Sequence, residues 1–183
     1  MSVLKLDRSI TFIGMAGVGK STMGKVLADK LSLPFQDTDD DVLKRLGTDT
    51  MFDYMVTHDE KQFLHIEEKS LERISSQPDR VIATGGSVVY SKKVMEKLSS
   101  FSLFIYLTDH IDRIIERTEG DDPRGTVFFD APDLTTLFRQ RDPLYKRYAD
   151  IVFHLPDTFD KSLIADKIIQ EIKVYMSSND KIV

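Results

Sequence analysis

The chain has 183 residues, of which 41% are hydrophobic and 30% charged. This length and composition are sufficient for one well-buried core, and the chain is too short for two domains of typical size. Its 30 acidic residues outnumber its 25 lysines and arginines, and no basic run marks a surface for nucleic acid. The lack of cysteine excludes disulfides, thiolate nucleophiles and zinc–thiolate sites, and no apolar segment approaches the roughly 20 residues of a membrane span.

These features predict a cytoplasmic protein that binds neither nucleic acid nor a membrane. We expect one domain over residues 1–176, followed by a loose tail at 177–183, and a monomer.

Short apolar runs alternate with helix-patterned stretches along the chain. The runs at 10–13, 81–83, 103–107 and 151–155 predict strands, and 34–36 is a fifth, weaker candidate. Such a β/α alternation predicts an α/β fold with a mostly parallel sheet between helices. Ligands of such folds bind outside the carboxyl ends of the strands, so functional residues are expected just after the strands.

Residues 14–22 fit the phosphate-binding loop pattern G-x-x-x-x-G-K-[ST], directly after the β-type run at 9–13. In such a loop, glycines let backbone N–H groups turn towards phosphates, Lys20 reaches the β- and γ-phosphates, and Ser21 ligates Mg²⁺. The apolar pattern at 20–31 predicts a helix whose positive end points at these phosphates. The alternative is a glycine-rich turn that binds nothing. The predicted nucleotide-binding residues are Gly17, Val18, Gly19, Lys20, Ser21 and Thr22.

Four carboxylates lie within five positions after the second strand candidate, at 37–41. Acids in this place either cap a helix, where the helix dipole favours them, or serve phosphoryl transfer. In the second interpretation one carboxylate holds Mg²⁺ and another orients or deprotonates an acceptor hydroxyl, and Asp37 and Asp39, two positions apart at a strand end, could both face the cleft. Gly85 and Gly86 follow the third strand and offer backbone N–H groups to a substrate, with a plain turn as the alternative.

Two arginines are candidates for the same pocket. Arg124 lies in the segment 119–126, whose charges, glycines and proline predict a mobile loop, and closure would bring its guanidinium over the transferring phosphoryl group. Arg141 precedes Pro143, which we expect to interrupt a helix and turn Arg141 towards a substrate carboxylate. The alternatives are a solvated loop charge for Arg124 and one more charge on a basic helix face for Arg141.

In its combination of motifs the chain resembles the shikimate kinases over about residues 10–172. The resemblance rests on the phosphate loop, Asp37-Thr38-Asp39, Phe63 with Ile66-Glu67, Gly85-Gly86, Arg117-Thr118 leading into a lid, and Arg141 before Pro143-Leu144-Tyr145. It implies a three-layer sandwich with a five-stranded parallel sheet, a mobile lid at about 118–130, ATP with Mg²⁺, and phosphorylation of a hydroxyl on a small carboxylated ring. The implied roles are Asp37 for the metal, Asp39 for substrate hydroxyls, Arg117 for adenine, Arg124 for the lid, and Arg141 for the substrate carboxylate.

Three positions depart from this family's pattern. Leu64 stands where the family usually carries an arginine that pairs with the shikimate carboxylate, and Lys61 lies one turn earlier on the same face. Ser87 replaces the usual third glycine, and Gly125-Thr126 follow Arg124 in place of a proline-led apolar run.

We therefore expect a small-molecule kinase with an anionic acceptor, shikimate being the leading candidate. One alternative is a kinase for a different hydroxy acid such as gluconate. The other is a non-catalytic ATP-binding regulatory protein.

Overall fold

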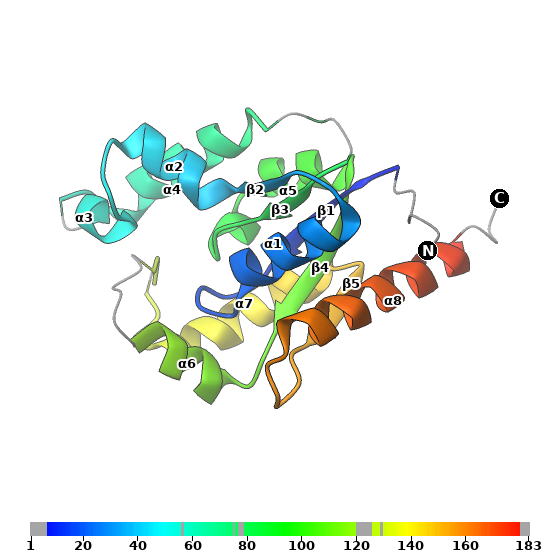
Figure 1. Ribbon diagram of the computed structural model, residues 1–183. Helices are drawn as coiled ribbons and strands as arrows, with labels where there is room; N and C mark the ends of the chain where they lie inside the picture. The colour runs from blue at the N-terminus through cyan, green and yellow to red at the C-terminus, as the bar shows by residue number, and fades with distance from the viewer. Residues whose placement is uncertain are drawn as a thin grey trace.

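The structure is a computed structural model that describes residues 7–55, 57–74, 76, 79–119, 126–128 and 130–179. A five-stranded parallel sheet forms its centre (Figure 1). Its strands are β1 (Ser9–Ile13), β2 (Phe35–Asp37), β3 (Val81–Ala83), β4 (Ser102–Thr108) and β5 (Ile151–His154), in the order β2-β3-β1-β4-β5. All neighbouring pairs run parallel. The predicted α/β fold with five parallel strands is confirmed, including the weak candidate at 34–36.

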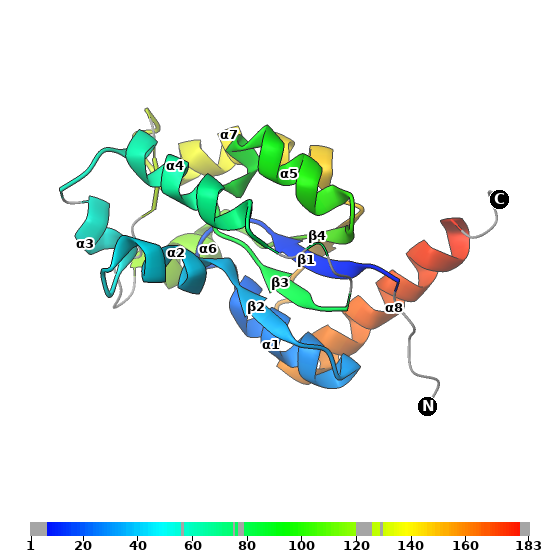
Figure 2. The ribbon, with the colours of Figure 1, turned by 90° about the horizontal axis from the view of Figure 1, so that it is seen from above.

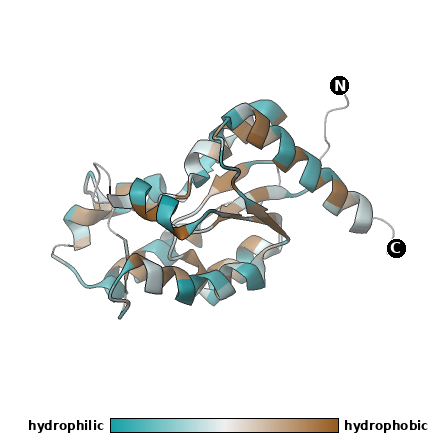
Figure 3. Cartoon of the chain, turned by 90° about the horizontal axis from the view of Figure 1, so that it is seen from below, coloured by the Kyte–Doolittle hydropathy of each residue, from teal (hydrophilic) through white to brown (hydrophobic). Residues whose placement is uncertain are grey.

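Helices cover both faces of this sheet. Helices α1 (Lys20–Leu31) and α8 (Lys161–Asn179) pack together on one face, while α5 (Lys92–Ser99) and α7 (Leu134–Tyr148) lie on the other (Figure 2). Burial on both faces explains why β1, β3 and β4 read as nearly continuous apolar runs. Figure 3 shows this arrangement, with hydrophobic residues gathered on the strands and on helix faces turned towards them.

A second, smaller apolar cluster lies among the helices that follow β2. It consists of Val42 from α2 (Thr38–Leu46), Tyr54 from α3 (Met51–Met55), Phe63 from α4 (Glu60–Leu71), and Val127. This cluster fixes α2 and α4 against each other beyond the carboxyl ends of β2 and β3 (Figure 1). The remaining elements are the 3-10 turn η1 (Val88–Tyr90) and α6 (Ile111–Glu119).

Two details differ from the sequence-based expectations. Helix α7 continues through Pro143 where an interruption was expected. Pro143 and Arg139, four residues earlier, are both exposed, so the carbonyl that loses its helical partner can reach water. Helix α8 extends to Asn179, so the tail expected from residue 177 is helical over its first residues, and 180–183 lie outside the described residues. None of the helices in the described ranges has the length and apolar content needed to cross a membrane.

Candidate active site

The loop between β1 and α1 has the backbone of an anion cradle. Gly14, Gly17 and Gly19 have φ values of 144°, 77° and 105°, which side chains other than glycine rarely adopt. A Cβ atom on Gly19 would meet no atom within 4 Å, so open space adjoins the N-terminus of α1. The ammonium of Lys20 donates to the carbonyl oxygens of Gly14 at 2.9 Å and Met15 at 2.7 Å. Loop, lysine and helix end therefore have the arrangement that the motif predicts.

Two oxygen donors proposed for a metal lie at this same end of the sheet. Ser21, one of the two, is in the first turn of α1 and is partly exposed, as is its neighbour Thr22, which was predicted to bind the nucleotide. Asp37 ends β2 and is the N-cap of α2, where its carboxylate accepts a hydrogen bond of 3.1 Å from the backbone N–H of Asp39. The helix-cap interpretation of the acidic run therefore holds for Asp37. Within the described residues its second carboxylate oxygen accepts no hydrogen bond, so capping and metal binding are compatible.

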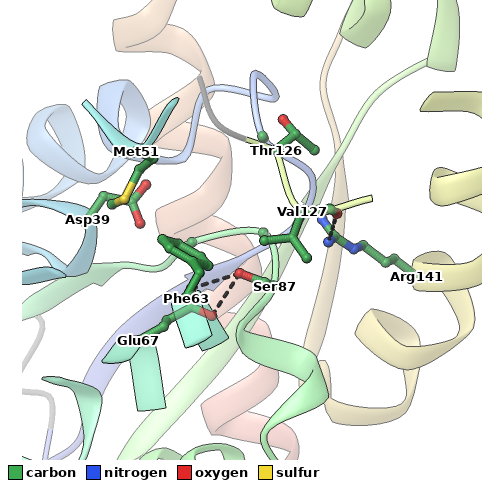
Figure 4. A pocket seen from close by; sticks show the side chains of 11 residues that line it. Asp39, Met51, Phe63, Glu67, Ser87, Thr126, Val127 and Arg141 are labelled. Atoms are coloured by element: carbon green, nitrogen blue, oxygen red, sulfur yellow. Dashed lines mark hydrogen bonds between the residues drawn. The ribbon is translucent and has the colours of Figure 1, made fainter. Parts of the chain in front are cut away.

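A pocket adjoins the phosphate loop and gathers the acceptor-binding residues predicted from the sequence. The polar side chains around it are Asp39, Glu67, Ser87, Thr126 and Arg141; the rest of its lining is Ala16, Met51, Phe63, Gly85, Gly86 and Val127. Figure 4 shows Asp39 and Glu67 on one side of the pocket and Arg141 on the opposite side. Ala16 belongs to the phosphate loop, so an acceptor in this pocket would lie next to a nucleotide phosphate.

Gly85 and Gly86 are required because charged side chains approach their backbone. A Cβ atom on Gly85 would lie 2.5 Å from Glu67 Oε1 and 2.9 Å from Asp39 Oδ1. A Cβ atom on Gly86 would lie 3.1 Å from Arg141 Nη1. The two glycines thus let two carboxylates and a guanidinium converge on one pocket.

Glu67 is a buried acid that the sequence analysis left without a role. Its carboxylate oxygens lie 2.9 and 2.7 Å from the hydroxyl of Ser87, which donates to them. The pKa of Glu67 is raised to about 7, chiefly by burial; the nearby charge of Asp39 also raises it, whereas the Ser87 hydrogen bond and the charges of Arg141 and Lys20 lower it. Glu67 therefore changes charge near neutral pH, inside the acceptor pocket. The sequence does hold a sign that Glu67 belongs to the pocket: it follows Phe63 by four positions, which places both side chains on one face of α4.

Asp39 also has a perturbed pKa. Burial raises it to about 6, the charge of Asp37 adds to this increase, and the ammonium of Lys20 opposes it. A carboxylate with a pKa just below neutral is ionised at pH 7 yet accepts a proton readily, which is the property of a general base. Asp39 lines the pocket beside the phosphate loop, and its role in activating an acceptor hydroxyl stays a prediction.

Arg141 is buried, with 1% of its surface exposed, which excludes the alternative of a solvated charge on a basic helix face. Its Nη2 donates to the carbonyl oxygen of Val127 at 2.6 Å, and its Nε donates to the hydroxyl of Tyr90 at 3.3 Å. The guanidinium carbon lies 5.1 Å from the centre of the Tyr90 ring. Helix α7 brings Arg141 into the pocket without the break expected at Pro143, because position 141 faces the sheet.

Arg117 lies on α6 beside the phosphate loop. It pairs at 2.7 Å with Asp109, a buried acid directly after β4 that the sequence analysis missed. Its guanidinium lies 5.8 Å from the Phe159 ring, and its Nη1 is buried without a hydrogen-bond partner in the described part of the chain. A Cβ atom on Gly17 would lie 2.5 Å from the Thr118 hydroxyl, so α6 packs directly on the loop. The adenine role of Arg117 stays a prediction.

The remaining predicted positions lie outside the pocket or outside the described residues. Arg124 and the middle of the expected lid fall in the undescribed segment 120–125. Leu64 is partly buried against the second apolar cluster, Lys61 is exposed, and neither lines the pocket. Arg141 is thus the arginine that lines the pocket among the described residues.

The comparisons with known proteins agree with one another. A family model of shikimate kinase matches residues 16–173. The chain is 33% identical over 169 residues to proteins named shikimate kinase 1 from Salmonella newport and Salmonella enteritidis, covering 91% of this chain and 96% of each relative.

Solved structures show the same likeness. The shikimate kinase of Acinetobacter baumannii in complex with shikimate superposes with a TM-score of 0.79 at 25% identity, covering 91% of this chain and 93% of that one. The Aquifex aeolicus shikimate kinase gives a TM-score of 0.72 at 25% identity, covering 94% and 98%. The phosphate loop lies beside a pocket in which carboxylates face an arginine, and the matches extend over nearly the whole chain. The chain therefore belongs to the shikimate kinase family.

Proposed function

We propose that this protein transfers the γ-phosphoryl group of ATP, with Mg²⁺, to a ring hydroxyl of shikimate or of a closely related carboxylated hydroxy acid. The observation that carries the proposal is the pocket beside the phosphate loop, with Asp39 and Arg141 on opposite sides of it. An acceptor with a carboxylate at one end and a hydroxyl at the other would place its carboxylate at Arg141 and its hydroxyl at Asp39.

The described residues fit a nucleotide with its metal ion. The phosphate loop offers left-handed glycines, the N-terminus of α1 and the ammonium of Lys20, while Ser21 and Asp37 offer oxygen ligands. Bound Mg²⁺ would supply charge neutralisation on the phosphates. Lys20 would add a positive charge next to the transferring group, and hydrogen bonds from the loop N–H groups would hold the phosphates in line with the acceptor.

The residues of the acceptor pocket divide into binding and proton-transfer roles. Arg141 would bind the carboxylate, since its guanidinium is already held by Val127 and Tyr90 and needs little reordering. Asp39 would accept the proton of the attacking hydroxyl, which its pKa of about 6 permits at neutral pH. We also propose that Arg117 contacts the adenine and that Arg124 acts from a closing lid.

A second candidate is a kinase for a different carboxylated hydroxy acid, such as gluconate. The observation that favours it is the apolar Leu64, which packs into the second apolar cluster at a position where the family usually has an arginine. Ser87 also adds a hydroxyl to the pocket where the family has glycine. Both changes affect what the pocket holds, and neither affects the phosphate loop.

The discriminating experiment is a phosphorylation assay over a panel of acceptors that includes shikimate and gluconate. Formation of a phosphate ester is followed directly by ³¹P NMR, with the Lys20→Ala variant as the measure of background hydrolysis. We expect Mg²⁺-dependent phosphorylation of shikimate. A phosphate ester formed only with another hydroxy acid supports the second candidate, and no ester with any acceptor contradicts both.

The proposed working form is a cytoplasmic monomer in which residues 1–176 act as one domain. Its partners are the nucleotide and the small anionic acceptor, with no nucleic acid and no membrane. The net charge of −5 and the lack of cysteine support this setting.

A further inference from the structure

A second hollow in the molecule is lined by three arginines. It has a volume of about 400 Å³ and lies at the ends of α2 and α4 that point away from the acceptor pocket. Arg45 comes from the last turn of α2, Arg73 follows the end of α4, and Arg80 directly precedes β3. The other lining residues are Gln36, Asp41, Ser70 and Ile74.

The three guanidinium groups lack anionic partners within the described ranges. No ion pair there involves Arg45, Arg73 or Arg80, although the protein as a whole is acidic. Asp41, the acid in the lining, instead accepts a hydrogen bond of 2.7 Å from Gln36 Nε2. Asp41 offsets one of the three positive charges in the lining, so a net positive charge remains, and a bound anion would reduce the repulsion between the arginines.

Arg80 adds an independent observation. Its Nη1 donates to Gln36 Oε1 at 3.3 Å, which holds the side chain over the edge strand β2. Its Nε is buried and has no hydrogen-bond partner among the described residues. A buried guanidinium N–H without an acceptor is costly and uncommon, so an acceptor that is not part of the protein would satisfy it.

We propose that Arg45, Arg73 and Arg80 form a binding site for a small metabolite that carries a phosphate monoester. Three arginines and one aspartate give the lining a net charge of +2, which matches the charge of about −1.5 to −2 that a phosphate monoester carries at neutral pH. Guanidinium groups are suited to phosphate oxygens because they donate parallel hydrogen bonds. The site is distinct from the phosphate loop, and this inference does not depend on the proposed kinase activity.

The position of the site connects it with the acceptor pocket. Helix α2 carries Asp39 in its first turn and Arg45 in its last. Helix α4 carries Glu67, which lines the acceptor pocket, and Ser70, which lines the arginine hollow. A phosphate held between Arg45, Arg73 and Arg80 would therefore join the two helices that carry the acceptor-binding acids.

The test is calorimetric titration with glycerol 3-phosphate while saturating ADP with Mg²⁺ occupies the nucleotide site. We expect binding that weakens as KCl is raised, because the contacts are ionic. Arg73→Gln and Arg80→Gln should each weaken it by about tenfold or more, the size expected for loss of a charge-assisted contact. The matched control is Arg147→Gln, an exposed arginine on α7, which should leave binding unchanged.

Two results would overturn the proposal: no binding of glycerol 3-phosphate once ADP is present, or binding of equal strength in both variants and the wild type. Arg73 is exposed, so its variant tests the site even if replacement of the more buried Arg80 disturbs folding. Circular dichroism and thermal melting of each variant verify the fold before titration.

Discussion

The hydroxyl of Ser87 lies 2.9 Å from one carboxylate oxygen of Glu67 and 2.7 Å from the other, inside the acceptor pocket. A serine where the family has glycine thus provides a hydrogen bond to a buried acid. This contact lowers the pKa of Glu67, while burial and the charge of Asp39 raise it. The two residues together influence whether Glu67 is charged near neutral pH.

Replacement of Ser87 by alanine should raise the pKa of Glu67 above its value of about 7 in the wild type, because the carboxylate loses its donor. The measurement is an NMR titration of the glutamate carboxyl carbons. Ser91→Ala is a matched control, since Ser91 donates to Glu68 at 2.6 Å outside the pocket. A Glu67 pKa that stays the same in Ser87→Ala would show that the hydrogen bond contributes nothing.

Glu67→Gln should stabilise the fold increasingly as pH rises. The folded-state pKa of Glu67, about 7, lies above the unfolded value near 4.5, so the native state binds more protons between these pH values. The free energy of unfolding of the wild type therefore falls as pH rises through this window, whereas glutamine does not titrate. Asp39, Arg141 and Lys20 face the same group and are unchanged in the variant. We expect the variant to gain about 1–3 kcal/mol at pH 8 relative to pH 5.

Thermal or urea unfolding of wild type and Glu67→Gln at pH 5 and pH 8 checks this prediction. If the free energy of unfolding differed between wild type and variant by the same amount at both pH values, Glu67 would not be protonated in the native state. A variant less stable than the wild type only at pH 8 would reverse the sign and contradict the buried-acid account.

Lys20→Ala should slow phosphoryl transfer by several decades while leaving the fold intact. Its ammonium contacts the phosphate loop, and a positive charge there stabilises the transferring group. Turnover is measured against Lys167→Ala, which removes an exposed lysine on α8. Near-normal turnover in folded Lys20→Ala would contradict the kinase proposal at its first step.

Asp39→Asn should reduce turnover far more than affinity for ATP, since an amide cannot accept the acceptor proton. Asp40→Asn changes the exposed neighbouring acid and serves as the control. Nucleotide affinity and single-turnover rate are measured separately. Equal losses of both would instead make Asp39 a metal ligand or a structural residue.

Leu64→Arg should tighten shikimate binding by about tenfold or more if it restores the second cation of the carboxylate clamp. Leu64 is partly buried against the second apolar cluster, so the longer arginine side chain has to leave that cluster to reach the acceptor pocket. An arginine that stays in the cluster would overpack it, at a cost of about 1–3 kcal/mol. Leu64→Met conserves volume without charge and is the control. Micromolar shikimate binding by the wild type, with no gain in the variant, would show that Arg141 suffices.

Much of the fold could be predicted because its signals are local. Apolar runs predicted β1, β3 and β4, because a strand buried on both faces needs a nearly uninterrupted apolar segment. The edge strands β2 and β5 have weaker patterns, partly buried in β2 and alternating in β5, and β2 was only a weak candidate. The phosphate loop could be predicted for the same reason: its glycines, lysine and serine act within nine consecutive residues. Asp37 and Asp39 were found because carboxyl ends of parallel strands share one edge of the sheet.

The charge state of the pocket was decided by tertiary structure. Ser87 and Glu67 are 20 positions apart and meet only because α4 packs over the loop after β3. Arg141 is buried because position 141 lies on the face of α7 that also buries Leu137 and Tyr145. Helix α7 continues through Pro143 because the carbonyl that loses its helical partner can reach water. The arginine hollow joins residues from α2, the end of α4 and the start of β3, which no local pattern connects. Sequence alone thus determined the elements and the nucleotide loop, whereas packing determined which charges share a low-dielectric space and therefore how they titrate and bind.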